Sequence, residues 1–292
     1  MQKEILRVFE YFYFFSYPLN FKTIKKYLGV KVNDKKLKKE VERLVKLKKI
    51  TFKRNLYTLG EYSKGKPEIR NSRFARRAKF EITQKKLNNF RLKSYLKLIS
   101  MFPQIKLVGL SGSAAMNNAS NKDDIDLFII ASTNRIWTTR LVCLITATLF
   151  GIKRSRLEKN VSDKVCLNLF FDEKNIEMPN FKRNYYIAHE IIQLKPLINK
   201  DYTYEMFLYR NRWVCDIFPN VEFPTSLPIR HREASRLGMT YILDFIENFL
   251  KKVQLYLINK HKTKEIITDT QLWFFPEDFE DKLPEFARKK LA

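Results

Sequence analysis

Hydrophobic positions in the first sixty residues follow first a helical and then a strand-like spacing. Apolar side chains recur at helical intervals in residues 2–15, 21–28 and 35–48. Gly29 stands where a helix typically ends, and Asn33 or Asp34 where the next typically begins. Residues 50–59 read as two short strands around Lys53-Arg54-Asn55. The pattern predicts three helices followed by a β-hairpin over residues 1–62.

Beyond residue 60 the pattern changes twice. After a loop at residues 61–68, a helical pattern with a basic outer face runs from Ile69 to Met101. Short apolar runs typical of buried strands follow at 105–110, 125–130 and 165–171, with a buried helix at 137–150. Helical spacing then returns, at residues 185–193, 204–213 and 233–261.

These elements predict an α+β protein, in which a small mixed β-sheet with packed helices follows the N-terminal helices. The expected divisions are residues 1–62, a basic connector helix at 63–103, a sheet domain at 104–200 and a C-terminal helical region at 201–292. The packing face of the last long helix should comprise its apolar stripe: Leu237, Tyr241, Leu243, Phe245, Ile246 and Phe249.

Chemistry concentrates between the first two apolar runs. The first run ends in Ser111-Gly112-Ser113, and the second opens with Asp124-Ile125-Asp126. Side chains two apart on a strand point to one face, so Asp124 and Asp126 should project together. Adjacent carboxylates repel each other, and a divalent cation such as Mg²⁺ or Mn²⁺ relieves that repulsion. With a glycine-serine turn able to hold phosphate oxygens, the pattern predicts a phosphoryl-transfer site.

This stretch resembles the signature of the DNA polymerase β-like nucleotidyltransferase superfamily. Gly112-Ser113, followed after ten residues by Asp124 and Asp126 between apolar runs, carries the resemblance over residues 105–130. It implies a nucleotidyltransferase-like sheet, catalytic and metal-binding roles for both aspartates, and nucleotide contacts from Ser111, Gly112 and Ser113. Arg154, in the basic segment after the buried helix, is a further candidate for phosphate contact.

The resemblance also implies a third carboxylate on the strand at 165–171, where the matching position is Asn168. Asparagine can ligate a cation through its carbonyl oxygen but cannot act as a base. Asp163 and Asp172 are alternative acids near this strand. The pair His189-Glu190 lies on a predicted helix, a setting in which such pairs are usually structural.

Positive charge is the second strong feature of the chain. Its net charge is +25, and residues 1–100 contain 28 Lys and Arg against 8 Asp and Glu. The element order of residues 1–62 is similar to a winged helix-turn-helix, which would place Lys35, Lys36, Lys39 and Arg43 on the recognition helix and Lys53-Arg54 at the wing tip. These side chains could contact nucleic-acid phosphates, although winged helices also serve as protein-interaction modules and lysine-rich faces are often simply solvated.

Cysteine spacing and hydropathy indicate the compartment. Cys143, Cys166 and Cys215 form no Cys-x-x-Cys pair, which favours a reducing cytoplasm. The longest apolar window, at 136–152, contains Arg140 and is short for a membrane span, so no membrane association is expected.

Two functions therefore stand as hypotheses. The first is a metal-dependent enzyme that moves a nucleoside monophosphate from a nucleoside triphosphate to a hydroxyl acceptor, which could be a nucleic acid, a protein or a small molecule. The second is a nucleic-acid-binding regulator whose nucleotidyltransferase-like domain is degenerate and only senses nucleotide.

Overall fold

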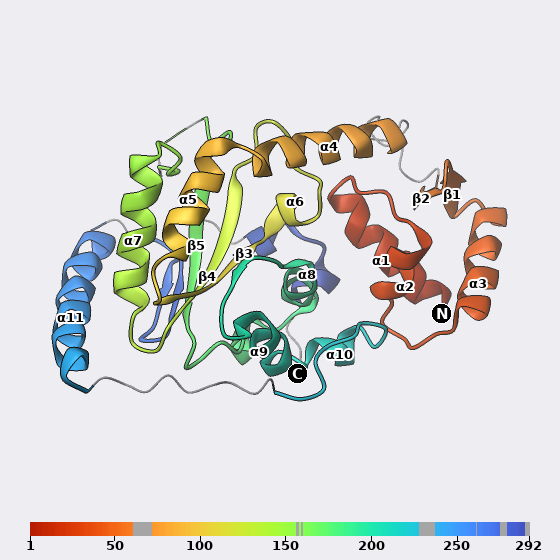
Figure 1. Cartoon of the computed structure of the whole chain (residues 1–292). Coiled ribbons are helices and arrows are strands. Elements are labelled where there is room, and N and C mark those ends of the chain that lie inside the picture. The colour runs from red at the N-terminus through yellow and green to blue at the C-terminus, as the bar shows by residue number, and fades with distance from the viewer. Residues whose placement is uncertain are drawn as a thin grey trace.

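Helices and strands alternate along the chain, and the protein belongs to the α+β class, as predicted. The computed structural model describes residues 1–60, 72–155, 158, 160–227, 237–260, 262–274 and 279–289 (Figure 1). The elements are α1 (Gln2–Phe14), α2 (Phe21–Lys26), α3 (Asp34–Lys46), β1 (Ile50–Lys53), β2 (Leu56–Leu59), α4 (Ser72–Leu87), α5 (Phe90–Ser100), β3 (Ile105–Leu110), α6 (Gly112–Ala115), β4 (Ile125–Ala131), α7 (Ile136–Leu149), β5 (Val165–Asp172), η2 (Asn180–Lys182), α8 (Tyr185–Gln193), β6 (Lys195–Asn199), α9 (Thr203–Arg210), α10 (Val214–Ile217), α11 (Leu237–Asn259), β7 (Ile266–Ile267), β8 (Gln271–Trp273), η3 (Phe279–Lys282) and α12 (Glu285–Arg288).

The N-terminal residues form the predicted three helices and a hairpin. Asn20 and Asn33 cap α2 and α3, because each side chain accepts a hydrogen bond from a backbone N–H three residues on. Strands β1 and β2 pair in antiparallel register, and Arg54 and Asn55 between them both have positive φ. Two left-handed residues in a two-residue loop match the right-handed twist of a hairpin.

The basic connector is two helices, whereas the sequence pattern predicted one. Helix α4 ends at Leu87 and α5 begins at Phe90, after Asn88-Asn89. The Asn89 side chain accepts a hydrogen bond from the Arg91 N–H at 2.9 Å, so this asparagine starts a new helix. The predicted linker at 61–68 and the start of the predicted connector at 63–71 lie outside the described residues.

A six-stranded mixed sheet forms the centre of the molecule, in the order β6-β3-β4-β5-β8-β7. Strand β4 pairs antiparallel with β3 and parallel with β5. Alternate residues of β4 enter two cores. Ile125, Leu127 and Ile129 pack with α5 and α7, while Phe128 and Ile130 pack with α8 and α9 on the other face. Asp126 is two residues before Phe128, so its side chain points to the same face of the sheet, towards α8. It lies at the end of the strand where β4 begins.

The C-terminal region contributes strands as well as helices, which corrects the prediction of a helical region at 201–292. Strand β8 pairs antiparallel with β5, and β7 pairs with β8. Strand β6 forms the opposite edge of the sheet, where Pro196 is tolerated. Among the described residues, no helix is both long enough and apolar enough to cross a bilayer.

Helix α11 packs through Glu247 and Gln254 together with Leu250, Leu255 and Ile258, so its predicted packing face is wrong. Tyr241, Phe245 and Phe249 are exposed, whereas Glu247 and Gln254 are buried against α7. Glu247 accepts hydrogen bonds from the Trp137 and Thr138 N–H groups, and so caps the start of α7. The first residues of the predicted helix, 233–236, lie outside the described residues.

Helix α8 joins the N-terminal helices to the sheet. The His189 ring lies between the rings of Tyr11 and Tyr27, with centroids 3.8 Å and 4.4 Å away and nearly parallel planes. Asn220, after α10, donates to the carbonyl oxygens of Leu28 and Val30. One continuous core therefore runs from α1 to the α8 face of the sheet.

Candidate functional site

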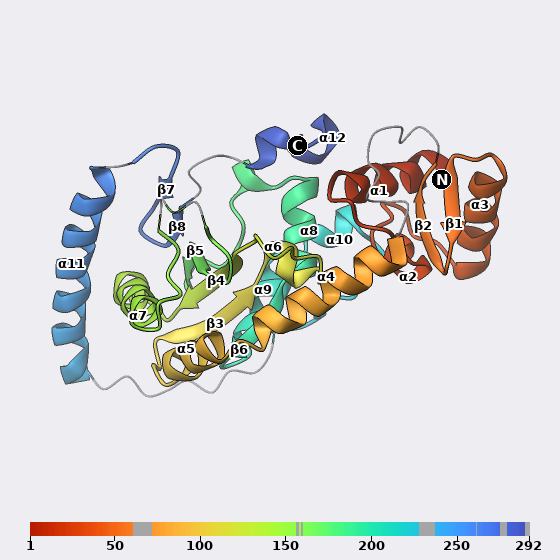
Figure 2. The same ribbon diagram turned by 90° about the horizontal axis from the view of Figure 1, so that it is seen from above.

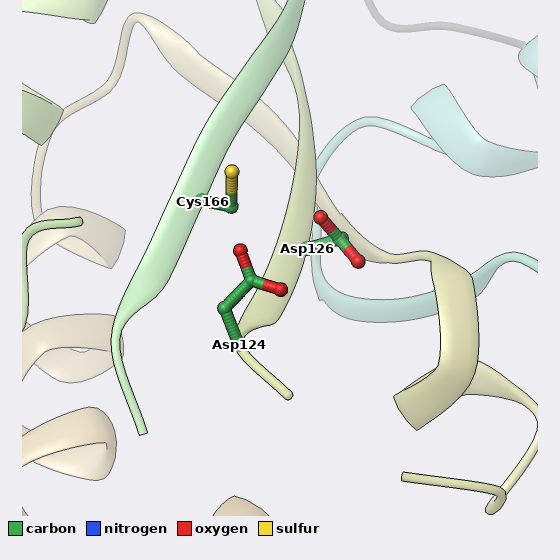
Figure 3. Close-up of side chains that lie close together, drawn as sticks. All are labelled: Asp124, Asp126 and Cys166. Carbon is green, nitrogen blue, oxygen red and sulfur yellow. The ribbon is translucent and has the colours of Figure 1, made fainter. Parts of the chain in front are cut away.

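Asp124 and Asp126 lie at the start of β4, and their side chains converge as the sequence predicted. Oxygen atoms of the two carboxylates and the Cys166 sulfur all lie within 4.8 Å of one another (Figure 3). Ile125 between them is fully buried, which fixes the direction in which its neighbours point. The strand thus holds two carboxylates together at the edge of an apolar core.

The glycine-serine turn faces this pair. Strand β3 ends where Leu110 pairs with Leu127, and the Ser111 N–H donates to the Asp126 carbonyl at 3.0 Å. Gly112 has φ +63°, and a Cβ atom built on it would lie 2.5 Å from Asp126 Oδ2. Both the left-handed backbone and this close approach require glycine. The predicted proximity of the turn and the acid pair is therefore present.

Burial and neighbouring acids make Asp126 unusual. Removal from water raises the pKa of Asp126 to about 8, and the charges of Asp124 and Glu190 add to this effect. Burial likewise raises the pKa of Glu190 to about 7, although a hydrogen bond from the Gly112 N–H, at 3.4 Å, opposes the rise. The site gathers carboxyl groups that resist ionisation where water stabilises their charge poorly, and a bound cation would favour their ionised forms.

Arg154 supplies positive charge on the opposite side of the pair from Gly112. Its Nη1 atom lies 2.5 Å from Asp124 Oδ2 and 3.2 Å from the Cys166 sulfur. The segment carrying it runs beside β5, because Lys153 forms a parallel bridge with Val165. Arg154 therefore lies at the predicted site, bound to an acid of the site itself.

Strand β5 brings two polar side chains to the acids, and the register differs from the predicted one. Cys166, and not Asn168, pairs with Asp126 in the parallel ladder. A bulge after Leu127 lets Asn168 reach the same carboxylate, to which its amide donates at 3.4 Å. The Cys166 thiol donates to Asn168 Oδ1 at 2.9 Å, and burial raises the pKa of this thiol to about 12.

The two serines of the turn have internal partners. Ser111 Oγ is 3.4 Å from the Asp126 carbonyl oxygen, and Ser113 Oγ donates to Asp123 Oδ2 at 3.0 Å. Asp123 also accepts hydrogen bonds from the backbone and hydroxyl of Ser120. The turn and the loop before β4 are thereby held together.

The alternative third acids lie away from the pair. Asp163 forms an ion pair with Lys86 at 2.9 Å, and Lys86 also donates to the carbonyl oxygens of Asn121 and Asp123. Asp172, at the far end of β5, accepts from the Asn134 and Lys174 N–H groups. Lys86 is almost fully buried, so it fixes the loop that leads into Asp124.

Sequence reasoning missed Cys166 and Glu190. Cys166 could have been found from its position two residues before Asn168, on the same strand face. The sequence pattern predicts a structural role for His189 and Glu190 together, and the His189 ring is indeed buried among aromatic side chains. Glu190 lies one position further round α8, where it reaches the Gly112 turn.

The basic side chains predicted to contact nucleic acid lie far from the acid pair. Lys35, Lys36, Lys39 and Arg43 are exposed on α3, and Lys53 and Arg54 are exposed at the hairpin tip. Within the described part of the chain, none of the four α3 residues forms an ion pair. Figure 2 shows α3 and the hairpin at one end of the molecule, beyond α1 and α2.

Comparison with known proteins identifies no relative: no family model, curated protein or solved structure matches this chain.

Proposed function

We propose that this protein is a metal-dependent nucleotidyltransferase with an N-terminal winged helix-turn-helix. The observation that carries the proposal is the convergence of Asp124 and Asp126 opposite Gly112, in a setting that raises the pKa of Asp126 to about 8. Ionising Asp126 beside Asp124 is costly without a cation. Mg²⁺ or Mn²⁺ matches the carboxylate oxygens.

In this proposal Asp124 and Asp126 would hold a divalent cation, which would supply charge neutralisation for the triphosphate and the leaving group. The Gly112 N–H would hold a phosphate oxygen, and the hydroxyls of Ser111 and Ser113 would do so after leaving the Asp126 carbonyl and Asp123. A phosphate oxygen would replace Glu190 at the Gly112 N–H, where Glu190 now accepts a long hydrogen bond.

The acceptor hydroxyl attacks the α-phosphorus, the bond from this phosphorus to the bridging oxygen breaks, and pyrophosphate leaves. Asn168 holds Asp126 but cannot take the hydroxyl proton, which leaves to water. Rate enhancement arises mainly from positioning and charge neutralisation.

The test is transfer from labelled nucleoside triphosphates, with Mg²⁺ or Mn²⁺, to RNA, DNA, protein and small-molecule hydroxyl acceptors. Asp124→Asn should abolish transfer, while Asp269→Asn, which changes an exposed aspartate on the β7–β8 loop, should retain it. Transfer that survives in a folded Asp124→Asn protein would refute the proposed role of this residue.

A second candidate function is a nucleic-acid-binding regulator with a degenerate site. It is favoured by the absence of a carboxylate at Asn168 and by the exposed cations of α3. Duplex binding should then weaken steeply with salt, with a slope of about −0.9 per phosphate contact. Replacing Lys36 and Lys39 with alanine should reduce that slope by about 2, whereas Lys252→Ala on α11 should not change it.

A further inference from the structure

The outer side of α11 is apolar along its length. Figure 1 shows α11 beyond α7, at the opposite end of the molecule from α3. Seven exposed apolar side chains define this outer face: Tyr241, Ile242, Phe245, Phe249, Val253, Tyr256 and Leu257. Leu243 and Ile246, also exposed, lie at its margin. An exposed apolar surface of this extent typically marks an interaction site.

Polar contacts hold α11 in this orientation. Asp244 forms an ion pair with Arg135 at 2.6 Å, and Glu247 accepts from the Trp137 N–H at 2.6 Å. Gln254 accepts from Arg140 at 2.6 Å and donates to the Trp137 carbonyl at 2.9 Å. A rotation that buried the outer face would break these contacts and leave buried polar groups of α7 unpaired.

The outer face has the area of a stable interface. The exposed fractions of Tyr241, Phe245, Phe249 and Tyr256 are 78%, 74%, 58% and 75%. With about 200 Å² per ring, these four side chains expose roughly 570 Å². The three aliphatic members raise this to about 800 Å², which is the contribution of one partner to a standard protein–protein interface.

The positions of these side chains are symmetric about Phe249. Phe245 and Val253 lie four residues to either side, Ile242 and Tyr256 seven, and Tyr241 and Leu257 eight. In an antiparallel pair of helices related by a twofold axis at Phe249, the two Phe249 rings would face each other, and each of the other aromatic residues would lie opposite an aliphatic one. Such self-complementarity is what a twofold interface requires.

We infer that α11 is a homodimer interface, at which two copies of this chain pair antiparallel across Phe249. The outer face contains no acidic side chain, and at helical spacing the exposed Lys252 and Lys260 lie within it, so both copies bring positive charge to the interface. With a net charge of +25 on each copy, mutual repulsion opposes pairing, so added salt should strengthen the dimer.

Sedimentation velocity of the full chain over a concentration series tests the inference. The expected species has twice the 35.0 kDa mass of one chain, and its fraction rises with salt. Phe249→Asp should weaken association by about a hundredfold or more, because it places two carboxylates on the axis. Phe90→Asp, a matched change at an exposed phenylalanine of α5, should leave it unchanged.

Cross-linking tests the pairing geometry without a destabilising charge. Phe249→Cys should form a disulfide-linked dimer on mild oxidation. Leu257→Cys should not, because antiparallel pairing separates the two copies of residue 257 by about 24 Å along the helices. A chain that stays monomeric at all salt concentrations, an unchanged Phe249→Asp dimer, or equal cross-linking at both positions would each overturn the inference. So would a monomer that binds anionic vesicles through this face.

Discussion

Replacing Asp126 with asparagine should stabilise the metal-free protein, and more so as the pH rises. The pKa of Asp126 is raised from 3.8 to about 8, chiefly by burial. Between these values the carboxyl is protonated in the folded state and ionised in the unfolded state. The folded state then binds more protons, so stability falls as the pH rises through this window. Asparagine imitates the protonated form at every pH.

The size of the effect follows from proton linkage. Each pH unit within the window removes about 1.4 kcal/mol from the free energy of unfolding, which sets a ceiling of about 6 kcal/mol. Part of the Asp126 side chain reaches water, and Arg154 lies nearby. Screening and relaxation should leave about 2–3 kcal/mol at pH 8 and under about 1 kcal/mol at pH 5.

Urea denaturation in EDTA at several pH values measures this difference. Asp269→Asn is the control, because the hydrogen bond and charge of Lys251 lower the pKa of this exposed carboxyl. Its replacement should therefore not raise the free energy of unfolding as the pH rises. Adding Mg²⁺ at a hundred times its dissociation constant should stabilise the wild-type protein by about 2.7 kcal/mol and the Asp126 variant far less. An Asp126→Asn protein no more stable than wild type at pH 8, or equally stabilised at pH 5, would contradict the reasoning.

Four further changes test the surroundings of the acid pair. Gly112→Ala should lower the free energy of unfolding by about 1–2 kcal/mol because its φ is left-handed, and by more if Asp126 cannot move away from the new methyl group. It should also weaken Mg²⁺ binding, as measured by calorimetry. Lys86→Met should destabilise by about 1–3 kcal/mol in urea, because two carbonyl oxygens and the half-exposed Asp163 lose their hydrogen-bond partner. Burial lowers the pKa of His189 well below its usual value, so the wild-type protein loses stability as the pH falls below about 6.5. In His189→Phe the difference in melting temperature between pH 7 and pH 5 should be smaller. Arg154→Met should strengthen binding of Mg²⁺ alone and weaken binding of the Mg²⁺–triphosphate complex, both measured by calorimetry.

The predictable parts of the fold are those encoded locally. The hairpin at 50–59 and the strands before Ser111 and after Asp124 were readable because apolar spacing and turn residues lie next to each other in the sequence. Strands β6, β7 and β8 were not predicted, because they are short edge or near-edge strands whose pairing depends on distant segments.

The acid pair could be predicted because two residues that are two positions apart on one strand always point to the same face of the sheet. Cys166 reaches the pair through the register in which β4 and β5 pair, and Glu190 through the packing of α8, and neither the register nor the packing has a local signal. The packing face of α11 was wrong for a related reason. Periodicity shows where the apolar stripe lies but not whether this chain covers it, and here polar contacts to α7 decide the orientation.

The position of Arg154 relates cation binding to nucleotide binding in the proposed enzyme. Its guanidinium contacts Asp124 and Cys166, two of the three groups whose ligand atoms lie together in the site. A divalent cation would compete with Arg154 for the Asp124 oxygen, and once displaced the guanidinium can bind a phosphate. Cation and triphosphate should therefore bind cooperatively. In the free protein Arg154 partly neutralises Asp124, and in the proposed enzyme this internal ion pair would be exchanged for one with the cation and one with the phosphate.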